Sequence, residues 1–301
     1  MRAFAWFLGL IAVALAAIAA FTYPAWLLLH PHFDFPFHRI GERIGMLALL
    51  LGFVAVARRL KLADRASLGF GLQRRRFGRE LLLALLIGVA TMLGVVAVMS
   101  ALGLLEWTRA GLTAGALARV VAARALSALV VALIEETFLR GAMHTAIERE
   151  SGTRAAVLLT ALIYAASHFF ASFHIAAPQV NPGSGVALLA GTLHAFARPL
   201  AIADAFLALF AVGVVLGLVR AATGNIAACI GLHAGWVWVM LVAHEFSHAR
   251  RAAPAAFLLS RFDGFVGWLV LAWTLALAVP LWRFYVARAA HVKRVPTQPR
   301  S

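Results

Sequence analysis

The sequence predicts an all-α protein: a polytopic membrane helix bundle with about eight transmembrane helices. Hydrophobic residues make up 63% of the 301 residues and charged residues only 13%, and the mean hydropathy is +0.90, which excludes an ordinary soluble domain. Apolar runs of roughly 20 residues recur along the chain, and each is long enough to cross a bilayer as a helix. We interpret residues 1–301 as a single membrane domain without an internal repeat.

The expected spans follow these apolar runs in chain order. The first, residues 4–29, is too long for a typical signal-peptide core, so we interpret it as a retained helix. Residues 173–202 contain several prolines and glycines and form a long connection, which either dips back into the membrane or forms a lid. The remaining spans are predicted at about 41–57, 80–104, 125–148, 153–172, 203–221, 225–246 and 264–287.

The strongest basic block lies between the second and third spans, at residues 58–79. Because cytoplasmic loops are enriched in Lys and Arg, we place this block in the cytoplasm, and alternation of the spans then puts both termini there as well. The formal charge is +15, but the basic residues lie between apolar spans, where they meet anionic lipid. We therefore predict an integral protein of a bacterial inner membrane, with membrane lipid as a partner and no nucleic acid.

Three charged residues interrupt the predicted span at 125–148: Glu135, Glu136 and Arg140. Charges at membrane depth are costly and usually mark a functional site. Glu136 and Arg140 are spaced i, i+4, so they share a helix face and can pair. Glu135 lies about 100° around the helix and is free to face another partner. A purely structural ion pair is the alternative interpretation.

Two histidines on later spans are predicted to reach the same depth as these charges. The midpoint between Glu135 and His168 falls in the turn at 150–153, so the two lie level in an antiparallel hairpin. His233 is followed by two small residues that would let another helix approach closely. We expect one carboxylate and two imidazoles to converge in the cytoplasmic half of the bundle.

These residue types suit the hydrolysis of a peptide bond. A carboxylate in an apolar site can serve as a general base, and a neighbouring imidazole can hold the same water. A second imidazole can donate to the oxyanion of the tetrahedral intermediate. Glu135, His168 and His233 could also bind zinc with water in the fourth position, so both a metal-free and a zinc mechanism stay open.

The motif Glu-Glu-x-x-x-Arg, followed by an aromatic-x-x-x-His and a His in a later helix, resembles the CAAX-protease and bacteriocin-processing family of intramembrane endopeptidases. The resemblance covers a core at about 125–240. It implies an eight-helix or similar bundle that cleaves membrane-associated or prenylated peptides, including peptides with C-terminal tails.

The resemblance also implies a role for each matched residue. Glu135 activates the water, and Glu136 and Arg140 organise the first motif. His168 assists the water, and His233 contributes to the oxyanion site or to a metal site.

The chain departs from the family pattern at two positions. Tyr164 stands where the family usually has Phe, and Val237 stands where it often has Asn, an oxyanion donor. Two other classes of function therefore stay open. One is a proton-coupled membrane transporter in which buried charges relay protons, and the other is an inactive scaffold that binds membrane peptides.

A rival motif lies near the end of the same later helix. His244, Glu245 and His248 fit His-Glu-x-x-His, the zinc-protease signature, and Asp263 with the next glycine resembles the Asp-Gly of site-2 intramembrane zinc proteases. The predicted topology places this motif about 28 Å from the start of its helix, too far to share a site with Glu135. A surface cluster without a metal is the alternative.

Overall fold

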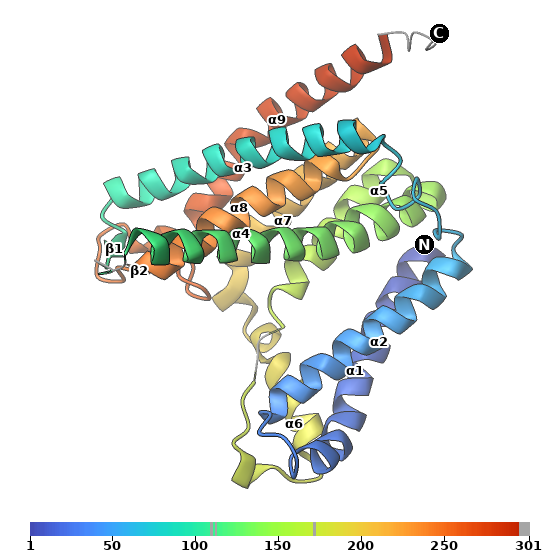
Figure 1. Cartoon of the computed structure of the whole chain (residues 1–301), viewed down its shortest axis with the longest axis vertical. Helices are drawn as coiled ribbons and strands as arrows, with labels where there is room; N and C mark the ends of the chain where they lie inside the picture. Colours follow the sequence, from blue (N-terminus) through green and yellow to red (C-terminus); the bar gives the residue numbers. More distant parts are fainter. Residues whose placement is uncertain (109–110, 112, 171–172, 295–301) are drawn as a thin grey trace.

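The structure is a computed structural model that describes residues 1–108, 111, 113–170 and 173–294, and it confirms an all-α membrane bundle (Figure 1). In this described part, seven helical segments are long and apolar enough to cross a membrane. One of them, Ala114–Ser167, has 54 residues and would extend about 81 Å as a straight helix. It breaks at Gly152, where φ is 82° and ψ is 168°, so it supplies two legs, and the expected count of about eight is met.

The element bounds follow the apolar runs closely, and the long connection 173–202 contains a short helix. The last two residues of the predicted span 153–172 lie outside the described residues. The helices are α1 (Arg2–Leu29), α2 (Phe37–Arg59), α3 (Arg74–Ala101), α4 (Ala114–Glu136), α5 (His144–Ser167), α6 (Ser184–Thr192), α7 (Pro199–Thr223), α8 (Ala227–Phe246) and α9 (Trp268–Arg294). A π-helix, η1 (Thr137–Met143), joins α4 to α5, and 3-10 turns lie at η2 (Ala177–Gln179), η3 (His194–Ala197) and η4 (Ala256–Leu258). Two strands, β1 (Leu105–Trp107) and β2 (Ser247–Ala249), pair antiparallel.

Small residues on α8 let it pack closely against α3. A Cβ atom added at Gly231 would lie 2.3 Å from the carbonyl oxygen of Leu81, and one added at Gly235 would lie 2.6 Å from that of Leu85. Distances this short are not tolerated, so only glycine fits at either position. The expectation that small residues beside His233 permit close helix contact is confirmed, and the contact fixes the rotation of α8 about its axis.

The turn between α7 and α8 lies where the predicted spans 203–221 and 225–246 leave a gap. Gly224 ends α7 in the left-handed conformation, at φ 69°, and its N–H donates to the carbonyl of Arg220 at 2.9 Å. The side-chain oxygen of Asn225 then accepts from the N–H of Ala227, the first residue of α8, at 3.0 Å. This sharp reversal lays α8 antiparallel to α7.

Helices α1, α2 and α6 form an arm beside the main bundle (Figure 1). The carboxylate of Glu150, at the turn within α5, accepts from two backbone N–H groups at the start of α1, at 2.6 and 2.7 Å. Phe138 on η1 contacts Phe7 of α1 and Phe53 of α2, with ring centroids 5.5 and 5.7 Å apart. The arm is therefore attached to the bundle at the π-helix that directly follows Glu135 and Glu136.

Candidate active site

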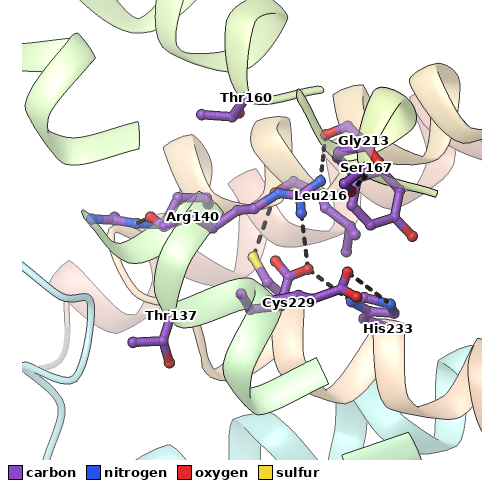
Figure 2. A network of polar contacts seen from close by, with 12 residues as sticks. Thr137, Arg140, Thr160, Ser167, Gly213, Leu216, Cys229 and His233 are labelled. Carbon is purple, nitrogen blue, oxygen red and sulfur yellow. Dashed lines mark hydrogen bonds and ion pairs between the residues drawn. The ribbon is translucent and has the colours of Figure 1, made fainter. Parts of the chain in front are cut away.

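The centre of the site is a fully buried ion pair. Nη1 of Arg140 lies 3.0 Å from Oε1 of Glu136, and neither side chain has any exposed surface. Nη2 of Arg140 donates to the carbonyl of Gly213 on α7 at 3.2 Å. Figure 2 shows Arg140 reaching between Gly213 and His233, while Thr137 points away. The i, i+4 pairing expected from the sequence is present, and the guanidinium joins α4 to α7.

His233 is held by the same carboxylate. Its Nδ1 lies 2.8 Å from Oε1 of Glu136, and the ring is only 2% exposed. Because that carboxylate oxygen also accepts from Arg140, Nδ1 must carry the proton in this bond. Nε2 is then the nitrogen left for chemistry, as an acceptor in the neutral ring or as a donor in the charged ring.

Glu135 faces the free nitrogen of this histidine. Its Oε2 lies 4.0 Å from Nε2 of His233, and this oxygen has no hydrogen-bond partner among the described residues. A separation of 4.0 Å is too long for a direct hydrogen bond but suits one bridging water. The side chain of Glu135 is 32% exposed, whereas that of Glu136 is wholly buried, so the two adjacent carboxylates have different surroundings.

Tyr164 connects the second histidine to this centre. Nδ1 of His168 lies 2.8 Å from the backbone oxygen of Tyr164, and because a carbonyl only accepts, Nδ1 carries the proton. Nε2 has no hydrogen-bond partner among the described residues. The Tyr164 ring lies edge-on to His168 and His233, at 4.6 and 5.7 Å between centroids, and Cζ of Arg140 lies 4.7 Å from its centre. No hydrogen bond or ion pair between Glu135 and His168 occurs among the described residues, and the Tyr164 ring instead connects His168 to His233.

Sequence reasoning missed a second buried arginine beneath the site. Nε of Arg220 donates to the carbonyl of Arg140 at 2.9 Å, and its Nη2 donates to Oγ1 of Thr145 at 3.2 Å. Arg140 lies within the π-helix, whose widened turn weakens the regular main-chain bonding. Arg220 therefore supports the segment that carries the ion pair. The available signal was an arginine inside the predicted span 203–221, a costly residue at that depth.

The described residues offer no arrangement for zinc. Among them, no group of three His, Cys, Asp or Glu side chains could hold a metal ion, and this includes Glu135, His168 and His233. Nδ1 of His233 is already occupied by Glu136. The zinc version of the chemistry thus finds no support in the geometry of the described residues.

The rival motif is not assembled into a site. Helix α8 ends at Phe246, so His248 lies in β2 and does not share a helix face with His244. Glu245 forms an ion pair with Arg124 of α4, and these side chains are 36% and 42% exposed. The His244 ring packs edge-on against Phe265, with centroids 5.1 Å apart. The motif is a partly exposed structural contact between α4, α8 and the loop before α9.

Comparison with known proteins agrees with the motifs. Residues 117–239 match the family model described as Rce1-like, type II CAAX prenyl endopeptidase. No curated protein and no solved structure gives a significant match to the chain. The matched region contains Glu135, Glu136, Arg140, His168 and His233, and it ends before the rival motif. The chain is therefore an integral membrane protein whose residues 117–239 match the Rce1-like domain of type II CAAX prenyl endopeptidases, in agreement with the family resemblance of its motifs.

Proposed function

We propose that this protein is an intramembrane endopeptidase that hydrolyses a peptide bond of a membrane-associated peptide without a metal. The observation that carries the proposal is the 4.0 Å gap between Oε2 of Glu135 and Nε2 of His233, which has the width for one water. The buried Glu136–Arg140 pair fixes one side of that gap. Membership of a family of membrane proteases supports the same reaction class.

In the proposed reaction, Glu135 is the general base. The water oxygen attacks the carbonyl carbon of the peptide while one of its protons passes to Oε2 of Glu135. The lone pair on Nε2 of His168 holds the other proton of the water. Glu135 then delivers its proton to the leaving amine nitrogen, the carbon–nitrogen bond breaks, and a carboxylic acid and a free amine result.

We assign stabilisation of the oxyanion to His233. Val237 provides no donor one turn further along α8. The indole N–H groups on either side of it are occupied, since that of Trp236 donates to Thr91 at 3.0 Å and that of Trp238 donates to the carbonyl of Val121 at 3.0 Å. In its charged form His233 donates to Glu136 through Nδ1 and presents Nε2–H to the oxyanion.

The decisive experiment replaces Glu135 with Gln, which keeps the side-chain volume and removes the base. The protein is reconstituted in liposomes with an internally quenched peptide that carries a C-terminal prenyl anchor, and with the same peptide lacking the anchor. We expect cleavage of the anchored peptide by the wild type, and a fall of about 10²–10⁴-fold in kcat for Glu135→Gln.

Glu245→Gln is the matched control, because it makes the same chemical change at the far end of α8. It should cleave at the wild-type rate. Undiminished cleavage by Glu135→Gln, or loss of cleavage in Glu245→Gln alone, would refute the assignment.

Dialysis against a chelator separates the metal-free mechanism from the zinc mechanism. Activity that persists without bound metal supports the glutamate mechanism, and activity restored only by Zn²⁺ contradicts it. A pH-sensitive dye inside the vesicles reports proton flux, which would favour a transporter if it occurred without cleavage.

A further inference from the structure

A second cavity lies at the other end of the bundle, between the start of α7, the loop from β2 to α9, and the start of α9. Its volume is about 540 Å³, within the range of sites for small ligands. Three charged side chains line it: Asp204, Arg251 and Arg261. Asp204 precedes Gly213 by nine residues on α7, about 13 Å along the helix, so this cavity is distinct from the Glu135 site.

The charges in this cavity do not neutralise one another. Asp204 is only 8% exposed, and it has no hydrogen bond or ion pair in the described part of the chain. Nη1 of Arg251 is fixed on the carbonyl of Ser260 at 2.8 Å, which leaves its other N–H groups available. A carboxylate with so little exposed surface and no partner is costly, and neither arginine of the cavity pairs with it, so Asp204 favours a cationic hydrogen-bond donor bound in the cavity.

The rim of the cavity is apolar and open. Leu200 is 92% exposed, Phe257 71% and Trp268 42%, and all three line the cavity together with the charged groups. Trp268 is the first residue of α9, and Asp204 lies five residues into α7, about 7.5 Å from its start. Tryptophan at a helix end and a shallow polar cavity both indicate the interface between lipid head groups and acyl chains.

We propose that this cavity binds the head group of a zwitterionic phospholipid of the phosphoethanolamine type. The ammonium group would donate to Asp204, and the phosphate would meet Arg251 and Arg261. The acyl chains would lie against the exposed apolar rim. A choline head group has no N–H to donate to Asp204, and a glycerol head group has no cation to neutralise it, so the cavity should discriminate between lipids that share one phosphate.

The test measures lipid retention and does not depend on catalysis. Purified full-length protein in detergent is titrated with phosphatidylethanolamine, phosphatidylcholine and phosphatidylglycerol of identical acyl chains, and bound lipid is counted by native mass spectrometry. We expect phosphatidylethanolamine to bind about tenfold more tightly than the other two. Asp204→Asn should abolish this preference, whereas Asp34→Asn, an exposed acid on the arm, should keep it.

A second variant keeps the test decisive if Asp204→Asn does not fold. Arg251→Gln should weaken the retention of all three lipids by a similar factor, because each carries the phosphate. Equal binding of the three lipids by the wild type would overturn the proposal, as would an unchanged preference in folded Asp204→Asn. Soluble glycerophosphoethanolamine tests whether the cavity recognises a free head group or a lipid. Because this compound lacks acyl chains, we expect it to displace bound phosphatidylethanolamine only at a large excess.

Discussion

Helix α8 carries two clusters of His, Glu and Arg, one toward each end, and they have opposite characters. Toward the Gly224 end, His233 contacts Glu136, which pairs with Arg140, and all three side chains are buried. Toward the strand end, Glu245 pairs with Arg124 while both side chains remain over one third exposed. The same residue types thus form a connected internal network in one place and a partly solvated contact in the other.

The difference shows that a sequence pattern marks a functional site only where the surrounding helices bring its side chains together. The strand-end cluster fits the more regular pattern, His-Glu-x-x-His, but the helix that would align its histidines ends at Phe246. The Gly224-end cluster is spread over three helices and has no compact pattern. Oε1 of Glu136 nevertheless joins Arg140 to His233. Oε2 of Glu135 has no hydrogen-bond partner among the described residues and lies 4.0 Å from Nε2 of His233.

The first prediction compares the two arginines directly. Arg140→Gln leaves the buried carboxylate of Glu136 without its cation, and we expect a loss of about 3–5 kcal/mol in the free energy of unfolding. Arg124→Gln removes a partly exposed pair and should cost at most about 1 kcal/mol. The single cysteine, Cys229, is fully buried, so a thiol-reactive fluorophore reports unfolding of each variant in detergent.

A double variant sharpens this contrast. Glu136→Gln combined with Arg140→Gln removes both charges, so the uncompensated buried charge disappears and part of the lost stability should return. The corresponding double variant of Glu245 and Arg124 should behave additively. If the losses in free energy of unfolding added up at Glu136 and Arg140 as well, the two side chains would not be coupled. The contrast between the buried and the exposed ion pair would then fail.

The second prediction concerns packing in the same two regions. A Cβ at Gly213 would lie 2.8 Å from Cα of Ala161, so Gly213→Ala should push α7 away from α5 and cost about 1–3 kcal/mol. The carbonyl of Gly213 accepts from Arg140, so cleavage should fall as well. Gly115→Ala, in the first turn of α4 with open space around it, should be neutral or slightly stabilising. Equal melting temperatures for the two variants would contradict this account.

The charged residues of the site could be predicted from the sequence, because a charged side chain inside a membrane span has a high free-energy cost. A buried charge is rare enough to be informative by itself, which singled out Glu135, Glu136 and Arg140. The turn at Gly224 also followed from local chemistry, because glycine alone adopts its conformation without strain. The arrangement of the spans followed from length and apolar content.

Four features could not be predicted, because they depend on contacts between distant segments. No local signal sets the π-helix after Glu136, and Arg220 reaches the carbonyl of Arg140 from 80 residues away. The choice of Glu136 over Glu135 as the partner of His233 depends on the rotation of α8, which its glycines fix against α3. The pairing of β1 with β2 joins strands about 140 residues apart.

The third prediction concerns a carboxylate outside the membrane, where the smallest effect is expected. Asp64 lies exposed in the loop between α2 and α3, and the hydroxyl and the N–H of Ser67 donate to it and hold the pKa of its carboxyl below the ordinary value. Ser67 in turn accepts from Arg149 at 2.6 Å and, through its carbonyl, from Thr145 at 2.8 Å, so the loop is tied to α5. Asp64→Asn weakens this tie.

The pH dependence follows from the sign of the shift. A carboxyl whose pKa is lower in the folded state stabilises the fold above its unfolded pKa, about 3.9, and this contribution disappears as the pH falls through the folded pKa. The wild type should therefore melt slightly above Asp64→Asn at pH 7, and the difference between the two melting temperatures should begin to shrink below about pH 4 and disappear below the folded pKa. Asp34→Asn serves as the control and should follow the wild type throughout. A difference that did not begin to shrink as the pH fell below about 4 would show that Ser67 holds the loop without the charge of Asp64. The carboxylate would then act here only through its shape.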